Sequence, residues 1–195
     1  MRSSIPPLAT LLAGVLLVVP AAAQEGYSCT WQASADALTS RASPPDSARA
    51  SIGGGFAKVC YGAPSARGRT MIGGEHVPYG ELWRLGANEA TRLYVSFPAS
   101  IGGVSVDPGA YSLYAVPGAE GWRVFVNRDT RHWGNQITEE VREEEVGSLA
   151  VEPESLEEHV ERMRLRFEPT GGRTAALVLE WENTRVRIPI RNTGE

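Results

Sequence analysis

An alternation of apolar and polar residues with a period of two constrains this 195-residue chain more than any other feature. Leu93, Val95 and Phe97, for example, are separated by polar or aromatic neighbours at every second position. Successive side chains of a strand point to opposite faces, so this pattern is typical of strands with one buried face. It recurs over residues 56–61, 92–97, 104–115, 122–126, 162–167 and 177–190.

Turn-forming residues separate these segments at intervals of about ten residues. Examples are Asp107-Pro108-Gly109, Pro117-Gly118 and Asn183-Thr184, each of which follows an alternating segment. Helical spacing is nearly absent, and only residues 137–146 could form a helical turn. We therefore predict an all-β fold, a mostly antiparallel β-sandwich over residues 50–191, for which a jelly roll is one arrangement.

The N-terminus has the features of a secretory signal peptide. Arg2 precedes an apolar stretch over residues 8–19, which ends in the small residues Ala21 to Ala23. We predict cleavage after residue 23, which leaves a leader segment over residues 24–49 and no membrane span; an uncleaved membrane anchor is the alternative. The mature protein is then exported, to the periplasm or beyond.

The chain has two cysteines, Cys29 and Cys60. In an exported protein an even number of cysteines favours a disulfide, and two buried free thiols are the alternative. Closing this loop would stabilise the fold by about 3–4 kcal/mol. The formal net charge of −4 argues against a general nucleic-acid-binding protein, because such proteins usually present a basic surface.

A dense segment between Tyr61 and Leu93 contains the most distinctive motifs of the chain. It includes Arg67-Gly-Arg69, Val77-Pro-Tyr-Gly80 and Trp83-Arg-Leu-Gly-Ala-Asn-Glu-Ala-Thr91. These motifs resemble a bacterial family known only as domain of unknown function 2911, and the resemblance extends over roughly residues 50–190. His76 departs from the family pattern, which usually has Leu there, so the resemblance does not support a shared catalytic histidine. The family implies no activity.

The segment from Trp83 to Thr91 combines an aromatic ring with Arg84, Asn88 and Glu89. Such a group could bind a polar ligand, with Trp83 as a stacking surface and the tight backbone at Gly86 shaping the loop. The alternative is a structural corner, in which the polar side chains satisfy one another and the loop backbone. Arg67 and Arg69 could bind an anion nearby, or could be solvated loop residues.

No motif for a known catalytic or metal centre appears. His76, His132 and His159 are far apart in sequence, so we expect surface histidines rather than metal ligands. The chain has no P-loop and no nucleophile-elbow motif, and we expect no cofactor. The leading hypothesis is a non-catalytic binding or structural module of the cell envelope, whose ligand is a glycan or small anion. The alternative is an envelope hydrolase with Glu89 as general acid or base.

Overall fold

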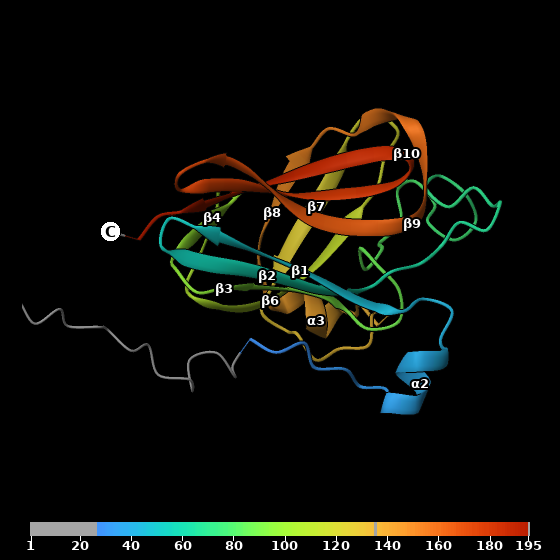
Figure 1. The fold of residues 1–195 in the computed structure, drawn as a ribbon, viewed down its shortest axis with the longest axis horizontal. Helices are drawn as coiled ribbons and strands as arrows, with labels where there is room; N and C mark the ends of the chain where they lie inside the picture. Colours follow the sequence, from blue (N-terminus) through green and yellow to red (C-terminus); the bar gives the residue numbers. More distant parts are fainter. Residues whose placement is uncertain (1–26, 135, 195) are drawn as a thin grey trace, which may run out of the picture.

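Two antiparallel β-sheets pack face to face in the computed structural model, which describes residues 27–134 and 136–194 (Figure 1). The larger sheet has the strand order β1-β2-β3-β6-β7-β8 and the smaller has the order β5-β4-β10-β9. The predicted all-β sandwich is confirmed. It has ten strands in the described residues, two more than a jelly roll has.

The strands of the larger sheet are β1 (Pro45–Ile52), β2 (Gly55–Gly62), β3 (Thr91–Val95), β6 (Gly109–Val116), β7 (Trp122–Asn127) and β8 (Glu145–Val151). Those of the smaller sheet are β4 (Ala99–Ile101), β5 (Val104–Val106), β9 (Glu154–Gly171) and β10 (Thr174–Asn192). Every pairing between these strands is antiparallel. Strand β1 also packs against β9, and β5 against β8, so the two sheets approach each other at both edges.

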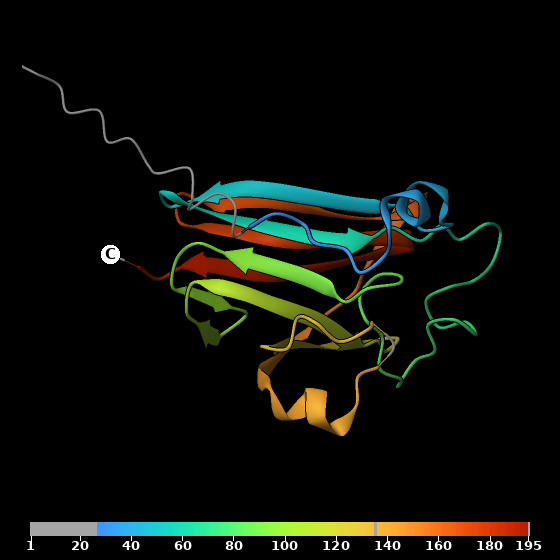
Figure 2. The same ribbon diagram turned by 90° about the horizontal axis from the view of Figure 1, so that it is seen from below.

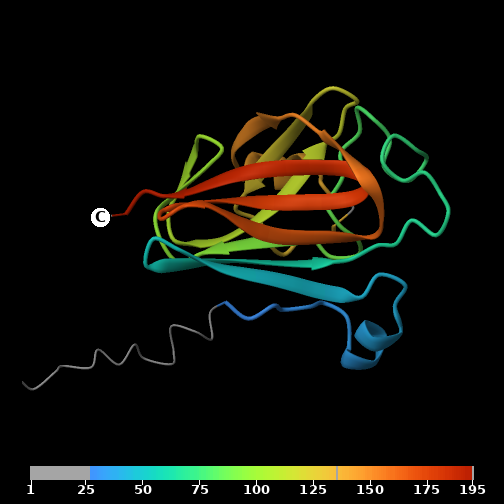
Figure 3. The ribbon, with the colours of Figure 1, turned by 45° about the horizontal axis from the view of Figure 1, so that its top comes forward.

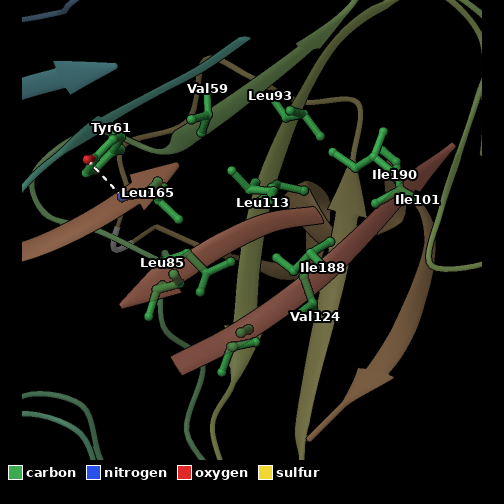
Figure 4. Packing of buried hydrophobic residues seen from close by; sticks show 14 of the residues in the cluster. Val59, Tyr61, Leu85, Leu93, Ile101, Leu113, Val124, Leu165, Ile188 and Ile190 are labelled. Carbon is green, nitrogen blue, oxygen red and sulfur yellow. Dashed lines mark hydrogen bonds between the residues drawn. The ribbon is translucent and has the colours of Figure 1, made fainter. Parts of the chain in front are cut away.

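Apolar side chains from the inner faces of both sheets form one core (Figure 4). Val59 and Leu93 from the larger sheet face Leu165 and Ile188 from the smaller one. The hydroxyl of Tyr61 links the two sheets by accepting a hydrogen bond from the backbone N–H of Leu165 at 2.9 Å. The alternation in the sequence therefore does separate the buried face of each strand from its outer face.

The smaller sheet is dominated by one long hairpin, formed by β9 and β10 (Figure 3). The sequence predicted that a tight turn at Asn183 and Thr184 divides residues 177–190 into two strands, and this prediction is wrong. Strand β10 continues through these residues, with register shifts around Glu182, whose φ of 52° is left-handed. A bulged strand bends without ending, so the apolar pattern changes face while the pairing with β9 continues.

Two short helices accompany the sheets in the described part of the chain. Helix α3 (Glu139–Glu143) lies within residues 137–146, where the sequence allowed a helical turn. Helix α2 (Ala35–Ser40) was not predicted; Ser34 caps it by accepting the N–H of Ala37 at 3.4 Å. Neither helix, within the part of the chain described, is long and apolar enough to cross a membrane.

The predicted signal peptide over residues 1–23 lies outside the described residues. Strand β1 begins at Pro45, so regular pairing starts a few residues before the expected boundary at residue 50. The described part of the leader is joined to the sandwich by a disulfide between Cys29 and Cys60, which confirms the predicted pairing. A disulfide is typical of proteins folded in an oxidising compartment.

Candidate functional site

The long connection between β2 and β3, residues 63–90, extends from one end of the sandwich (Figures 1 and 2). Two interactions fix its path on the body of the protein. Trp83 exchanges two backbone hydrogen bonds of 2.7 Å with Ala115 of β6. The carboxylate of Glu182 accepts the backbone N–H groups of Met71 at 3.0 Å and Ile72 at 2.8 Å. The connection is therefore held against the sandwich by these hydrogen bonds and is not a free loop.

A cavity of about 510 Å³ lies between this connection, Trp181 of β10, Gly134 and Ile137. Its polar lining consists of Ser43, Arg69, His76, Arg84 and Asn88. Its apolar lining includes Met71, Val77, Leu82, Trp83, Ile137 and Trp181. No carboxylate belongs to the described lining residues, so the side chains that can carry charge there are two arginines and a histidine.

The tryptophans beneath the cavity are held by ring packing. The ring of Trp83 stacks on that of Trp181 with centroids 5.9 Å apart, and it meets Trp122 edge-on at 6.0 Å. Trp122 and Trp181 are almost completely buried, at 2% and 1% exposure, and so belong to the core. Trp83, at 8% exposure, presents only a small part of its ring to the cavity. These rings therefore do not form a flat aromatic platform for a sugar.

The backbone of the Trp83–Thr91 segment turns sharply at two residues. Leu85 and Asn88 have left-handed φ angles of 54° and 64°, a region that Asn tolerates and Leu rarely adopts. Gly86, by contrast, is needed for close approach, since a Cβ there would lie 2.8 Å from the Thr91 hydroxyl. The sequence suggested a tight backbone at Gly86, but the left-handed φ angles occur at Leu85 and Asn88.

Arg84 lies partly buried in the cavity wall. Its Nε donates to the carbonyl of Gly86 at 3.3 Å, which also accepts the indole N–H of Trp83 at 3.2 Å. Burial lowers the pKa of Arg84, and the negative charge of Glu89 opposes that change. Gly134 packs closely on this group, since a Cβ there would come within 2.4 Å of the Cδ atom of Arg84. Arg84 thus brings a positive charge to a fixed position.

Arg69 approaches the cavity from the opposite part of the connection. It donates to the carbonyls of Ala66 at 2.9 Å and Ser65 at 3.2 Å, and to Nε2 of His76 at 3.1 Å. Because a guanidinium is always a donor, His76 accepts with Nε2 and carries its proton on Nδ1. Three of the five N–H groups of Arg69 are thus engaged, which leaves two without a partner among the described residues.

The structure brings together Trp83, Arg84, Asn88 and Arg69 of the predicted site residues, and it separates Arg67 and Glu89 from them. Arg67 donates to the carbonyl of Ala42 at 2.9 Å and does not line the cavity. Glu89 is 1% exposed and its carboxylate pairs with Arg41 at 2.7 Å. A carboxylate in this position has no route to a substrate, so the geometry gives no support to the hydrolase alternative.

The histidines differ from one another in their surroundings. His159 is half exposed, in keeping with the surface position predicted for it. The prediction is wrong for His132, whose side chain is 4% exposed and whose backbone N–H donates to Asp129 at 3.3 Å. Burial lowers the pKa of His132 and Asp129 opposes that change. No cluster of metal-binding side chains occurs among residues 27–134 and 136–194.

Sequence reasoning missed His76, Trp181 and Ser43 as parts of the cavity lining. His76 was set aside because it departs from the family pattern, yet it supports Arg69 directly. Trp181 and Ser43 come from parts of the chain far from the motif-rich segment. No local motif marks them, so only their position in the fold could identify them.

Comparison with known proteins gives one match. Residues 43–190 match the model of a protein family described as protein of unknown function (DUF2911). No curated protein and no solved structure matches the chain. The family match spans well over half of the sequence and includes the connection that walls the cavity, so the chain belongs to the DUF2911 family.

Proposed function

We propose that this protein is an exported, non-catalytic binding module for a small organic anion, held in the cavity beside Arg84. The observation that carries the proposal is the charge of the described lining, which contains the guanidinium groups of Arg69 and Arg84 but no carboxylate. Arginine N–H groups form strong, directed hydrogen bonds with carboxylate, sulfate and phosphate oxygens. A cavity of about 510 Å³ is within the usual size range of small-molecule sites.

The apolar part of the lining indicates the rest of the ligand. Met71, Val77, Leu82 and Ile137 surround the charged groups with aliphatic and thioether surface. Leu82 is 38% exposed and adds accessible apolar surface to this lining. We therefore expect an anionic group attached to an apolar or weakly polar body, rather than a bare inorganic ion.

The disulfide between Cys29 and Cys60 supports the exported location, because such bonds persist mainly in oxidising compartments. An exported ligand-binding module needs no catalytic group, and Glu89 is not available as one. A purely structural role for the Trp83–Thr91 segment is the alternative, favoured by the shared hydrogen bonds of Trp83 and Arg84 to the carbonyl of Gly86.

A ligand panel tests the proposal. Thermal shift and isothermal titration calorimetry would compare acetate, benzoate, glucuronate, sulfate and phosphate with the neutral compounds benzamide and glucose. A ligand that binds only the folded protein raises its melting temperature, so at least one organic anion should do so while its neutral counterpart does not. Binding of glucose as strongly as glucuronate would instead indicate a glycan site that does not depend on charge.

Substitution of Arg84 then locates the binding. Arg84→Gln should weaken binding of the anion at least tenfold, since a charged hydrogen bond contributes about 1.5–3 kcal/mol. Arg123→Gln, an equal charge change at an exposed position of β7, is the matched control. If no compound shifts the melting temperature, and Arg84→Gln only destabilises the fold, the structural alternative is correct.

A further inference from the structure

Residues 27–43 of the leader segment are attached to the face of the larger sheet that points away from the core. The disulfide joins Cys29 to Cys60 of β2 with a Cα–Cα distance of 5.7 Å. One residue later, Thr30 accepts hydrogen bonds from the guanidinium of Arg92 of β3 through both its hydroxyl and its carbonyl. The aromatic ring of Tyr27 packs edge-on against Phe56 at 4.8 Å. The path of the leader is therefore set before it reaches α2.

Arg41, directly after α2, is the residue that the leader places against the site. Its Nη1 lies 2.7 Å from Oε2 of Glu89, and the two side chains are only 10% and 1% exposed. Its guanidinium also lies 5.0 Å from the ring centre of Trp31, a second leader residue. Glu89 has no other ion-pair partner within the described residues, and its Oε1 has no hydrogen-bond partner there.

Glu89 is positioned directly behind the cavity wall. It follows Asn88, which lines the cavity, and its backbone pairs with Trp133, the neighbour of the lining residue Gly134. The carbonyl oxygen of Asn88 and the Cδ atom of Arg84 lie so close to Gly134 that a Cβ atom there would come within 2.4 Å of each. The negative charge of Glu89 acts on Arg84, the cation of the proposed site.

A carboxylate behind the wall would compete with a bound anion for the positive charge of Arg84. Charges interact more strongly across a buried, low-dielectric region than across water, so this competition would weaken anion binding. An arginine paired with the carboxylate cancels most of its charge. In this protein the compensating arginine comes from the leader, 48 residues earlier in the chain.

We propose that Arg41 is a positioning residue of the anion site, which neutralises Glu89 and so prevents this carboxylate from weakening the binding of an anion beside Arg84. This inference rests on the proposed function, because it describes how the leader regulates the affinity of that same site. It gives the disulfide-linked leader a role in binding as well as in stability. Arg41 does not line the cavity and so does not itself contact the ligand.

Calorimetric titration of four proteins with benzoate, glucuronate and phosphate tests the inference. Arg41→Gln should weaken anion binding at least tenfold, because Glu89 is then uncompensated. The double variant Arg41→Gln/Glu89→Gln should bind within threefold of the wild type, and Glu89→Gln alone at least as tightly as the wild type. Benzamide and glucose report any loss that does not depend on ligand charge, and Arg123→Gln is again the control for net charge.

The outcomes separate the inference from the proposed function. If the wild type binds none of the anions, both are overturned. If it binds an anion and Arg41→Gln binds that anion equally well, only the inference is overturned. The inference also fails if the double variant is as weak as Arg41→Gln, since Arg41 would then act through the fold or through its own charge.

Arg41→Gln leaves a buried carboxylate unpaired, and the variant could fail to fold for that reason. Comparison of Glu89→Gln with the double variant avoids this problem, since neither contains that carboxylate. Because Arg41 acts mainly through Glu89 in this scheme, the double variant should bind each anion less than tenfold more weakly than Glu89→Gln, which keeps the positive charge of Arg41. A tenfold weaker affinity in the double variant would overturn the inference without any measurement on the single Arg41 variant.

Discussion

Glu89 and Glu180 are both buried carboxylates, but the protein holds them in different ways. Glu180, in β10, is completely buried and contacts Arg164 at 2.6 Å, Arg166 at 2.9 Å and Arg185 at 2.6 Å. These contacts engage both of its oxygens. Glu89 contacts one arginine through one oxygen. The first carboxylate is saturated with hydrogen bonds, whereas the second is only half satisfied.

The two carboxylates also differ in how their partners are brought to them. The arginines around Glu180 lie on β9 and β10, which are neighbours in sequence and are paired along most of their length. Arg41 reaches Glu89 from a leader that the disulfide fastens to the sheet. The comparison teaches that the Glu180 cluster is built into the hairpin itself, whereas the Glu89 pair depends on a separately attached segment beside a cavity.

Removal of the disulfide should have the largest effect and should affect the two carboxylates unequally. The Cys29→Ser/Cys60→Ser variant should lose roughly 3–4 kcal/mol of unfolding free energy, as expected for closure of a loop of this length. Urea unfolding measures this loss. Hydrogen exchange should become faster around Glu89 and remain slow along β9 and β10.

Wild-type protein treated with a reductant is the control for this variant, since the reductant breaks the same disulfide without a substitution. Equal acceleration of exchange in both regions would show that the leader supports the whole sandwich rather than the Glu89 pair.

Glu180→Gln should destabilise the protein by roughly 3 kcal/mol, the lower end of the range for breaking a buried ion pair. The lower end applies because the three arginines are between 27% and 56% exposed and can turn toward water. Urea unfolding is again the measurement. Glu154→Gln, which removes a half-exposed partner of Arg187 at 2.9 Å and of Arg185 at 3.8 Å, is the matched control and should cost less than about 1 kcal/mol. Equal losses of unfolding free energy in the two variants would show that the buried Glu180 contributes no more to stability than the half-exposed Glu154.

Acid should weaken the Glu180 cluster. Burial by itself would raise the pKa of Glu180, but hydrogen bonds from Arg166, Arg185 and Arg164 outweigh it and lower the pKa from 4.5 to about 2. A lowered pKa in the folded state contributes stability that is present above the unfolded pKa and is lost as the pH falls from about 4.5 toward 2.

This loss amounts to at most roughly 3 kcal/mol, and salt should reduce it because the arginines are partly exposed. Unfolding free energies measured at intervals between pH 5 and pH 2 would show it. The wild type and Glu154→Gln should lose this stability together, while Glu180→Gln should have a flatter profile. Parallel profiles for all three proteins would mean that other carboxylates cause the acid sensitivity.

Glu89→Gln should have a smaller effect than Glu180→Gln, a loss of roughly 2 kcal/mol, because Glu89 pairs with one arginine and Glu180 with three. The amide oxygen of Gln can still accept from Arg41, which limits the cost. Thermal and urea unfolding measure the change. A loss greater than that of Glu180→Gln would show that the half-satisfied carboxylate is the more important one, and would reverse the comparison.

The fold class was predictable because it depends on a local pattern. Alternation places Val59, Leu93 and Leu165 on inner faces whatever their partners are, so a sandwich follows from the sequence. The bend in β10 was not predictable in this way. A turn at Asn183 and a bulge at Glu182 have similar local signals, and only the continued pairing with β9 distinguishes them.

The candidate site was predictable only in part, for a related reason. The string from Trp83 to Thr91 supplied Trp83, Arg84 and Asn88, because these residues are close in sequence. The same string suggested Glu89 as a partner of the ligand, but the backbone turns at Leu85 and Asn88, and Glu89 instead lies behind the wall. Two left-handed residues therefore place the side chains of the sequence neighbours Asn88 and Glu89 on opposite sides of the cavity wall.

The sequence by itself determined the alternating strands, the two cysteines that pair and the membership of a family with distinctive motifs. These follow from local periodicity, from residue counts and from strings that can be read in one dimension. Only the tertiary structure decided that Arg41 pairs with Glu89, that Trp181 and His76 join Arg84 at one cavity, and that Arg67 does not. The physical reason is that burial and charge pairing depend on distances across the fold, and residues far apart in the chain acquire those distances only when the two sheets pack.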